Sequence, residues 1–282
     1  MSSQTLIDAQ HLHDLAHTHD ALIVDCRFAL SDPDGATRDY AQGHIRGGVY
    51  ADLNRDLSDL SKQGLGRHPL PDASAFSAVL GRWGWKPGMQ VVGYDAANGA
   101  IAAARLWWML RLIGERNVAV LDGGVKAWTD AGFALSAEFA PRRVTSVDVQ
   151  FASDQIVDST QLQRALQKPE ILLIDARAAE RFRGDIEPLD PVAGHVPGAR
   201  NRPFCDNLDP EGRFKPAEQL REEFEALLAG HDAVNTVHMC GSGVTACHNL
   251  LAMEYAGMSG SRIYAPSWSG WISESTRQVA LG

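Results

Sequence analysis

Long apolar runs and an excess of positive charge are both missing from this chain of 282 residues. No segment approaches the ~20 apolar residues that a membrane-spanning helix needs. The formal net charge of -9 argues against a nucleic-acid partner, because contact with phosphates needs a basic face. We therefore expect no membrane and no nucleic-acid binding, and an anionic ligand would have to be held by local positive groups.

Cysteine is also scarce. The four cysteines are too few for a disulfide framework in a chain of this length, and none form a C-x-x-C pair. Reduced thiols fit a cytoplasmic protein. The first twenty residues combine no apolar stretch with a cleavage-like site, so no signal peptide is expected. With no long apolar stripe demanding a partner, we expect a monomer.

The sequence that is present repeats itself. LIVDCRFAL followed by YAQGHIRGGVY resembles LLIDARAAE followed by VAGHVPGARN, and two further pairs continue the order, VVGYDAANGA with TVHMCGSGVT and VLDGGVKAW with IYAPSWSGW. Four matched landmarks in one order indicate a tandem duplication. They align Asp25 with Asp175, His44 with His195, Asp95 with Cys240, and Trp128 with Trp271.

Each half alternates short β-like runs with helix-like segments, which predicts an α/β fold with a mostly parallel sheet flanked by helices. The polar stretch near the middle lacks helical periodicity. We therefore expect one domain over residues 1–138, a linker over 139–152 and a second domain over 153–282.

Cys240 stands where a strand would end and a helix would begin. NTVHM before it is β-like, CGSGVT forms the turn, and ACHNLLAMEYAG has helical spacing. Gly241 and Gly243 allow backbone N–H groups to turn inward, and a helix N-terminus adds positive potential at the same point. This setting favours the thiolate form of Cys240, a nucleophile for soft sulfur. Cys247 lies within the expected helix and is predicted to pack in the core.

The matching loop of the first half, YDAANGA, carries Asp95 in place of a cysteine. A carboxylate cannot perform thiolate chemistry and would repel an anionic donor. We therefore expect one active site, in the second half, and a catalytically inactive first half. The repeated G-H-x-x-G motif occurs in both halves, so His44 and His195 are predicted to be structural.

Taken together, GHIRGG, GHVPGA, CGSGVTA and YAPSWSGW resemble the landmarks of tandem rhodanese domains over nearly the whole chain. The resemblance implies two rhodanese-like domains and ping-pong transfer of a sulfane sulfur through a Cys240 persulfide, without a cofactor. The acceptor would be cyanide, a small thiol or a thioredoxin-like protein. It also implies substrate binding by Arg181 and by the loop residues Gly241, Ser242, Gly243, Val244 and Thr245.

The loop CGSGVT is similar to that of the 3-mercaptopyruvate sulfurtransferases, whereas thiosulfate sulfurtransferases typically carry Arg and Lys after the cysteine. A cation about 4 Å from a bound anion contributes roughly 1–4 kcal/mol. The neutral pair Gly241 and Ser242 therefore disfavours dianionic thiosulfate more than mercaptopyruvate. A second arginine typical of mercaptopyruvate enzymes falls on Asp190, which keeps thiosulfate as the alternative donor; Arg183 is a candidate substitute, although its spacing from Arg181 points the two apart on a helix.

In mercaptopyruvate enzymes, the serine equivalent to Ser242 is thought to join a histidine and an aspartate of the first domain in relaying a proton. The resemblance assigns these roles to His68 and to Asp56 or Asp59. Such a relay is ordinary acid–base catalysis.

Two other functions fit the sequence less well than sulfur transfer. A cysteine phosphatase needs an arginine six residues after the cysteine, where this chain has Ala246. A non-catalytic sulfur carrier or interaction module would not need the complete loop around Cys240. A metal site is not expected at His11, His13, His17 and His19, since their spacing is mixed and no cysteine accompanies them.

Overall fold

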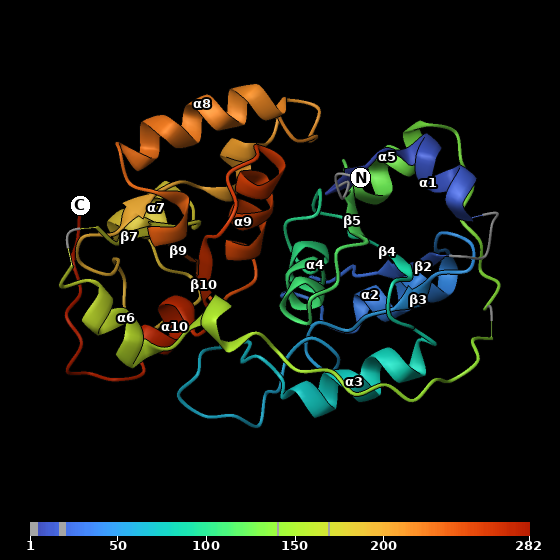
Figure 1. Ribbon diagram of the computed structural model, residues 1–282, viewed down its shortest axis with the longest axis horizontal. Helices are drawn as coiled ribbons and strands as arrows, with labels where there is room; N and C mark the ends of the chain where they lie inside the picture. Colours follow the sequence, from blue (N-terminus) through green and yellow to red (C-terminus); the bar gives the residue numbers. More distant parts are fainter. Residues whose placement is uncertain (1–4, 17–20, 140, 169) are drawn as a thin grey trace. The chain divides into compact units, whose positions relative to one another are not determined.

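The computed structural model describes residues 5–16, 21–139, 141–168 and 170–282 (Figure 1). Two compact units make up the chain. The first consists of Met1–Asp59, Leu70–Ala152 and Glu211–Arg213, and the second of Leu60–Pro69, Ser153–Pro210 and Phe214–Gly282. The ten-residue segment Leu60–Pro69 thus comes from the first half of the sequence but belongs to the second unit.

Both units contain a parallel sheet of the same topology. In the described residues, the first sheet has the order β1-β5-β4-β2-β3 and the second the order β6-β10-β9-β7-β8, with every pairing parallel. The strands of the first unit are β1 (Leu6–Ile7), β2 (Ala21–Asp25), β3 (Val49–Tyr50), β4 (Gln90–Tyr94) and β5 (Val118–Leu121). Those of the second are β6 (Ile156–Val157), β7 (Leu172–Asp175), β8 (Arg200–Asn201), β9 (Thr236–Met239) and β10 (Arg262–Tyr264). The predicted duplication and α/β fold class are confirmed.

Helices follow the strands in both units (Figure 1). The α-helices of the first unit are α1 (Ala9–Ala16), α2 (Gly35–Gln42), α3 (Ala73–Arg82), α4 (Ala103–Leu112) and α5 (Gly124–Asp130). Those of the second are α6 (Ser159–Ala165), α7 (Ala179–Arg183), α8 (Ala217–Leu228), α9 (Ala246–Tyr255) and α10 (Ser267–Trp271), with short 3-10 turns at Ser153–Gln155, Phe204–Asn207 and Ala233–Asn235. No helix in the described ranges is long and apolar enough to cross a membrane.

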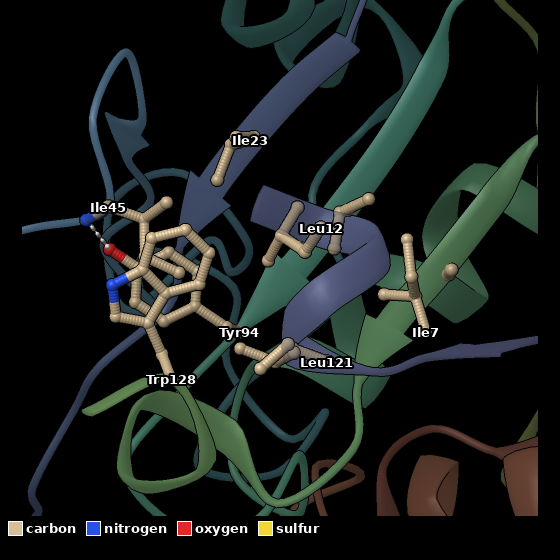
Figure 2. Close-up of a cluster of buried hydrophobic side chains, with 10 residues drawn as sticks. Ile7, Leu12, Ile23, Ile45, Tyr94, Leu121 and Trp128 are labelled. Carbon is tan, nitrogen blue, oxygen red and sulfur yellow. Dashed lines mark hydrogen bonds between the residues drawn. The ribbon is translucent and has the colours of Figure 1, made fainter. Parts of the chain in front are cut away.

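Each unit has its own hydrophobic core. In the first, Leu12 of α1 and Trp128 of α5 pack with residues of four strands, and the Tyr94 hydroxyl accepts a 3.0 Å hydrogen bond from the Ile45 backbone N–H (Figure 2). The second core is built on the equivalent elements and consists of Val157, Leu162, Leu173, Val196, Val237, Met239, Tyr264, Trp268 and Trp271. The central strands are buried on both faces, which explains their continuous apolar sequences.

A buried ion pair ends the second strand of each unit. Arg27 donates to both oxygens of Asp25 and, through Nη2, to the carbonyl of Gly43 at 2.7 Å. In the second unit, Arg177 binds Asp175 and donates to the carbonyl of Gly194 at the same 2.7 Å. These two arginines therefore fix the turns that precede the repeated histidines.

The histidines of the G-H-x-x-G motif are structural, as predicted. His44 forms an antiparallel bridge with Ser136, and His195 forms one with Ala280. The Nδ1 atom of His44 hydrogen bonds with the Tyr40 carbonyl, and that of His195 with the Phe182 carbonyl. Each histidine thus joins a turn to the chain that follows the last helix of its unit.

His238 of β9 predicts a specific loss of stability in acid. It is fully buried, and among the described residues neither ring nitrogen has a hydrogen-bond partner; burial lowers its pKa from 6.5 to about 3. Below pH 6.5 the unfolded chain takes up a proton that the folded chain refuses until about pH 3. The free energy of unfolding should therefore fall by about 1 kcal/mol for each unit by which the pH is lowered over this window.

Urea unfolding of the wild type and of His238→Leu at several pH values from 7 to 4.5 checks this expectation. The variant should lose less stability than the wild type as the pH falls. Parallel pH profiles would refute the assignment to His238.

Candidate active site

Cys240 directly follows β9 and precedes a loop that enters α9 at Ala246. The cysteine is 2 % exposed, and the strand before it is fully buried. Val244 is buried and Thr245 half-buried in the same loop. The predicted order of strand, loop and helix is confirmed.

The two loop glycines serve different purposes. Gly243 has φ of +75°, and a Cβ there would lie 2.3 Å from the carbonyl oxygen of Ala265, so only glycine fits. Gly241 lies outside the left-handed region, and its Cβ would instead lie 3.2 Å from Nη2 of Arg67. The expectation that both glycines give unusual backbone freedom is therefore wrong for Gly241. Its lack of a side chain instead leaves room for the guanidinium group of Arg67.

The backbone of Cys240 is held on both sides by the start of α10. Ser267 Oγ accepts a 3.1 Å hydrogen bond from the Cys240 N–H and donates to the Tyr264 carbonyl at 3.0 Å. The Cys240 carbonyl accepts a 2.9 Å bond from the N–H of Trp268. Ser267 adopts φ of +53°, an unusual conformation for a residue with a side chain.

The first unit has glycine at the equivalent place. Gly124 has φ of +60°, and the N–H of Val125 next to it donates to the Asp95 carbonyl at 2.9 Å. The second unit therefore keeps the strained conformation but replaces glycine by a serine whose hydroxyl binds Cys240. The alignment of the two halves pairs these segments, but it does not reveal this role of Ser267.

The carboxylate of Asp95 lies inside the loop that follows β4. The carboxylate is fully buried and accepts hydrogen bonds from four backbone N–H groups, those of Ala97 (2.8 Å), Gly99 (2.8 Å), Ile101 (3.1 Å) and Ala103 (3.2 Å). Burial raises the pKa of Asp95, and the four donors oppose that rise. The loop is thus an anion cradle filled by an internal carboxylate.

Ser242 and His68 meet in the second unit. Nδ1 of His68 lies 2.9 Å from Oγ of Ser242, and both residues are buried, with exposures of 4 % and 8 %. His68 comes from the segment Leu60–Pro69. Which of these two atoms donates depends on the imidazole tautomer. A hydrogen bond that can run in either direction is suited to passing a proton between the two side chains.

The carboxylates suggested for the relay, Asp56 and Asp59, belong to the first unit. Asp56 accepts hydrogen bonds from the Asp52 N–H at 2.9 Å and from Arg82 at 2.6 Å. Burial raises the pKa of Asp56. The participation of Asp56 or Asp59 in a relay stays a prediction.

Arg181 extends from α7 into a group of buried carboxylates. Its guanidinium binds Glu187 at 2.6 Å and Asp190 at 3.2 Å. Burial raises the pKa of Glu187, but hydrogen bonds from Arg181 and neighbouring backbone N–H groups outweigh it and lower the pKa overall. Arg183 binds Asp185 on the surface at 2.7 Å, so it does not substitute for a second arginine beside Arg181.

Asp190 has a second cation that sequence reasoning missed. Its Oδ1 accepts from Nη1 of Arg67, while its Oδ2 accepts from Nη2 of Arg181. Arg67 precedes His68, so both residues come from the same segment of the chain. The signal available in the sequence was Asp190 itself, an acid where a second arginine was expected; its side chain is buried in the structure and is paired with cations.

The remaining cysteines lie in different surroundings. Cys247 is fully buried in α9, with Sγ 3.5 Å from the carbonyl of Gly243, which confirms its predicted place in the core. Burial raises the pKa of the Cys26 thiol strongly and that of the exposed Cys205 thiol more modestly. Neither environment favours a thiolate.

The described residues contain no group of three or more metal-ligating side chains. His11 contacts Asp8 at 2.6 Å, and His13 stacks on Phe133. His17 and His19 lie outside the described residues.

Substitution of Ser267 tests how Cys240 is held. Ser267→Ala leaves the buried Cys240 N–H without its acceptor and keeps the strained φ, so we expect a loss of about 1–3 kcal/mol in unfolding free energy. Ser267→Gly also removes the acceptor but relieves the strain, and should be less destabilised than the alanine variant. Chemical denaturation measures both; equal or reversed stabilities would contradict the strain.

Comparison with known proteins places this architecture. The model of the rhodanese-like domain matches residues 8–131 and 158–274. The chain is 48% identical over 284 residues to a probable 3-mercaptopyruvate sulfurtransferase of Pseudomonas aeruginosa, covering 100% of both chains. It is 38% identical to a putative thiosulfate sulfurtransferase, SseB, of Mycobacterium tuberculosis, covering 99% of this chain and 98% of that one.

Among solved structures, SseA of Escherichia coli, described as a 3-mercaptopyruvate sulfotransferase, superposes with a TM-score of 0.80 at 28% identity, covering 94% of this chain and 99% of that one. The 3-mercaptopyruvate sulfurtransferase of Leishmania major gives 0.83 at 30% identity, covering 95% and 74%. With two matched domains and full-length relatives, this chain belongs to the rhodanese-like family.

Proposed function

We propose that the protein is a sulfurtransferase that takes a sulfane sulfur from 3-mercaptopyruvate, carries it as a persulfide on Cys240 and passes it to a thiol or to cyanide. The observation that carries the proposal is the setting of Cys240, a buried thiol on a strand–loop–helix turn beside the paired Ser242 and His68. The name of the 48% identical relative supports the same donor.

The first half-reaction balances without a cofactor. The Cys240 thiolate attacks the sulfur of mercaptopyruvate, and the bond between that sulfur and carbon breaks. The electron pair remains on carbon as the enolate of pyruvate, which takes up a proton. The enzyme is left with Cys240 bearing one additional sulfur as a persulfide.

Ser242 and His68 supply the proton for that enolate. The 2.9 Å contact between Ser242 Oγ and His68 Nδ1 supports a transfer along this pair, with Asp56 or Asp59 orienting the imidazole. Arg181 and the loop residues Gly241, Ser242, Gly243, Val244 and Thr245 bind the donor.

In the second half-reaction, a thiolate or cyanide attacks the outer sulfur of the persulfide. The sulfur–sulfur bond breaks, and its electrons return to Cys240 as the thiolate. A small thiol or a thioredoxin-like protein is the proposed acceptor. We further propose that the protein acts as a monomer in the cytoplasm.

The proposal also assigns a role to each part of the chain. Residues 1–138 form a catalytically inactive domain, 139–152 a linker, and 153–282 the catalytic domain. The support for an inactive first domain is Asp95, whose carboxylate already fills the loop that corresponds to the Cys240 loop. His68 falls within residues 1–138 of the sequence but belongs to the second compact unit.

Thiosulfate is the alternative donor, with the same persulfide mechanism. The name of the 38% identical relative supports it. Against it stands the neutral pair Gly241 and Ser242, which adds no cation for a compact dianion. Mercaptopyruvate carries a single carboxylate and is less dependent on such cations.

Intact-mass measurement tests the persulfide. After incubation with mercaptopyruvate and removal of excess donor, the wild type should gain the mass of one sulfur atom, which dithiothreitol should remove. Cys247→Ser should behave like the wild type, while Cys240→Ser should gain nothing. A persulfide that persists in Cys240→Ser would refute the assignment of the nucleophile, and an unmodified wild type would refute sulfur transfer.

Steady-state kinetics with cyanide as acceptor test the donor. We expect a higher kcat/KM for mercaptopyruvate than for thiosulfate, because the latter places a second negative charge in a site without added loop cations. A higher value for thiosulfate would favour the alternative function.

A further inference from the structure

Two guanidinium groups approach the cysteine loop at Gly241. A Cβ built on Gly241 would lie 3.2 Å from Nη2 of Arg67, 3.6 Å from Nη1 of Arg181 and 3.7 Å from its Nη2. Gly241 directly follows Cys240 in the chain. The absence of a side chain at this position therefore leaves both cations next to the reactive residue.

One carboxylate orients both groups. Asp190 uses Oδ1 for Nη1 of Arg67 and Oδ2 for Nη2 of Arg181, and its side chain is only 3 % exposed. Glu187 binds Arg181 through Nε and Nη2. The two carboxylates therefore occupy only one edge of each guanidinium group.

The other edges carry hydrogen-bond donors that have no partner. In the described part of the chain, neither Nη2 of Arg67 nor Nη1 of Arg181 forms a hydrogen bond, and Nε of Arg67 is buried without an acceptor. The buried Nε of Arg67 is costly to leave without an acceptor, whereas the two Nη groups are accessible and free to bind a ligand. A ligand with two coplanar oxygens, such as a carboxylate, would satisfy donors from both arginines.

The charge of the cluster distinguishes between anions. Arg67 and Arg181 are balanced formally by Glu187 and Asp190, and Arg177, which also contacts Glu187, is balanced by Asp175, so the group has no net charge. A monocarboxylate brings one negative charge to this balanced group, whereas thiosulfate brings two. Directed donors without a net positive charge favour the planar monocarboxylate over the dianion.

We propose that Arg67 is the second substrate-binding arginine of this enzyme and that it grips the donor's carboxylate together with Arg181. Asp190 is the positioning residue that holds the two guanidiniums in place. The acid at the position where a second arginine is expected thus recruits an arginine from the segment Leu60–Pro69. This proposal rests on the proposed function, because mercaptopyruvate supplies the carboxylate.

The experiment compares two donors that differ only in this group: mercaptopyruvate and mercaptoacetone, in which a methyl group replaces the carboxylate. For Arg67→Met, kcat/KM for mercaptopyruvate should fall about tenfold or more, chiefly through KM, while kcat/KM for mercaptoacetone stays within about twofold. Arg67→Lys, which keeps the charge but loses the planar fork, should fall between the wild type and the methionine variant.

Arg183→Met is the matched control, because Arg183 binds Asp185 on the surface and touches neither acid of the cluster. Its ratio of kcat/KM values for the two donors should equal that of the wild type. Asp190→Asn should lower the ratio as Arg67→Met does, and Asp190→Glu should restore part of it. Equal losses with both donors in Arg67→Met would mean a structural role and would overturn the proposal.

A binding measurement separates this proposal from the proposed function. Calorimetry with 3-mercaptopropionate on Cys240→Ser needs no turnover, and adding Arg67→Met should weaken Kd about tenfold, while adding Arg183→Met should leave Kd unchanged. An unchanged Kd on adding Arg67→Met, or no binding at all, would overturn the carboxylate grip. An unmodified Cys240 in the wild type would instead overturn sulfur transfer, whatever the Kd.

Discussion

The backbone of Cys240 is fixed from both sides by one short segment, and the site depends on that constraint. Ser267 Oγ binds the Cys240 N–H, and the Trp268 N–H binds the Cys240 carbonyl. A nucleophile at the end of a buried strand would otherwise move with its loop. Pinned in this way, the thiol stays in register with the partners that reach it from other segments, as preorganised catalysis requires.

The start of α10 also holds the rest of the cysteine loop and the segment Leu60–Pro69 in place. Ser269 donates to the Gly241 carbonyl through both its N–H and its hydroxyl, and its hydroxyl oxygen also accepts from the Arg67 N–H. A Cβ at Gly66 would lie 2.4 Å from the Pro266 carbonyl. The motif that follows β10 therefore connects the cysteine loop to the segment carrying Arg67 and His68.

Much of the fold could be predicted because the duplication made the sequence its own reference. His44 and His195 recur at equivalent points, so their structural role could be argued from repetition, and the aligned Asp25 and Asp175 also have equivalent contacts. Cys240 stood out against Asp95 for the opposite reason, a difference at a matched position.

Arg67 and Ser267 could not be found in this way. Arg67 meets Asp190 across 123 positions of sequence, and no local pattern encodes such a contact. Ser267 acts through a hydroxyl in a conformation that composition does not reveal. The sequence did carry a partial signal in Asp190, an acid at the position where a second arginine was expected, but it did not identify a partner.

The segment Leu60–Pro69 has a consequence for how this chain can be divided. Although it lies within the half of the sequence whose loop carries Asp95, it belongs to the unit that contains Cys240, and it carries both His68 and Arg67. A cut between the two halves of the sequence would therefore separate Cys240 from residues of its own compact unit. The repeat in the sequence and the folded unit thus do not have the same boundaries.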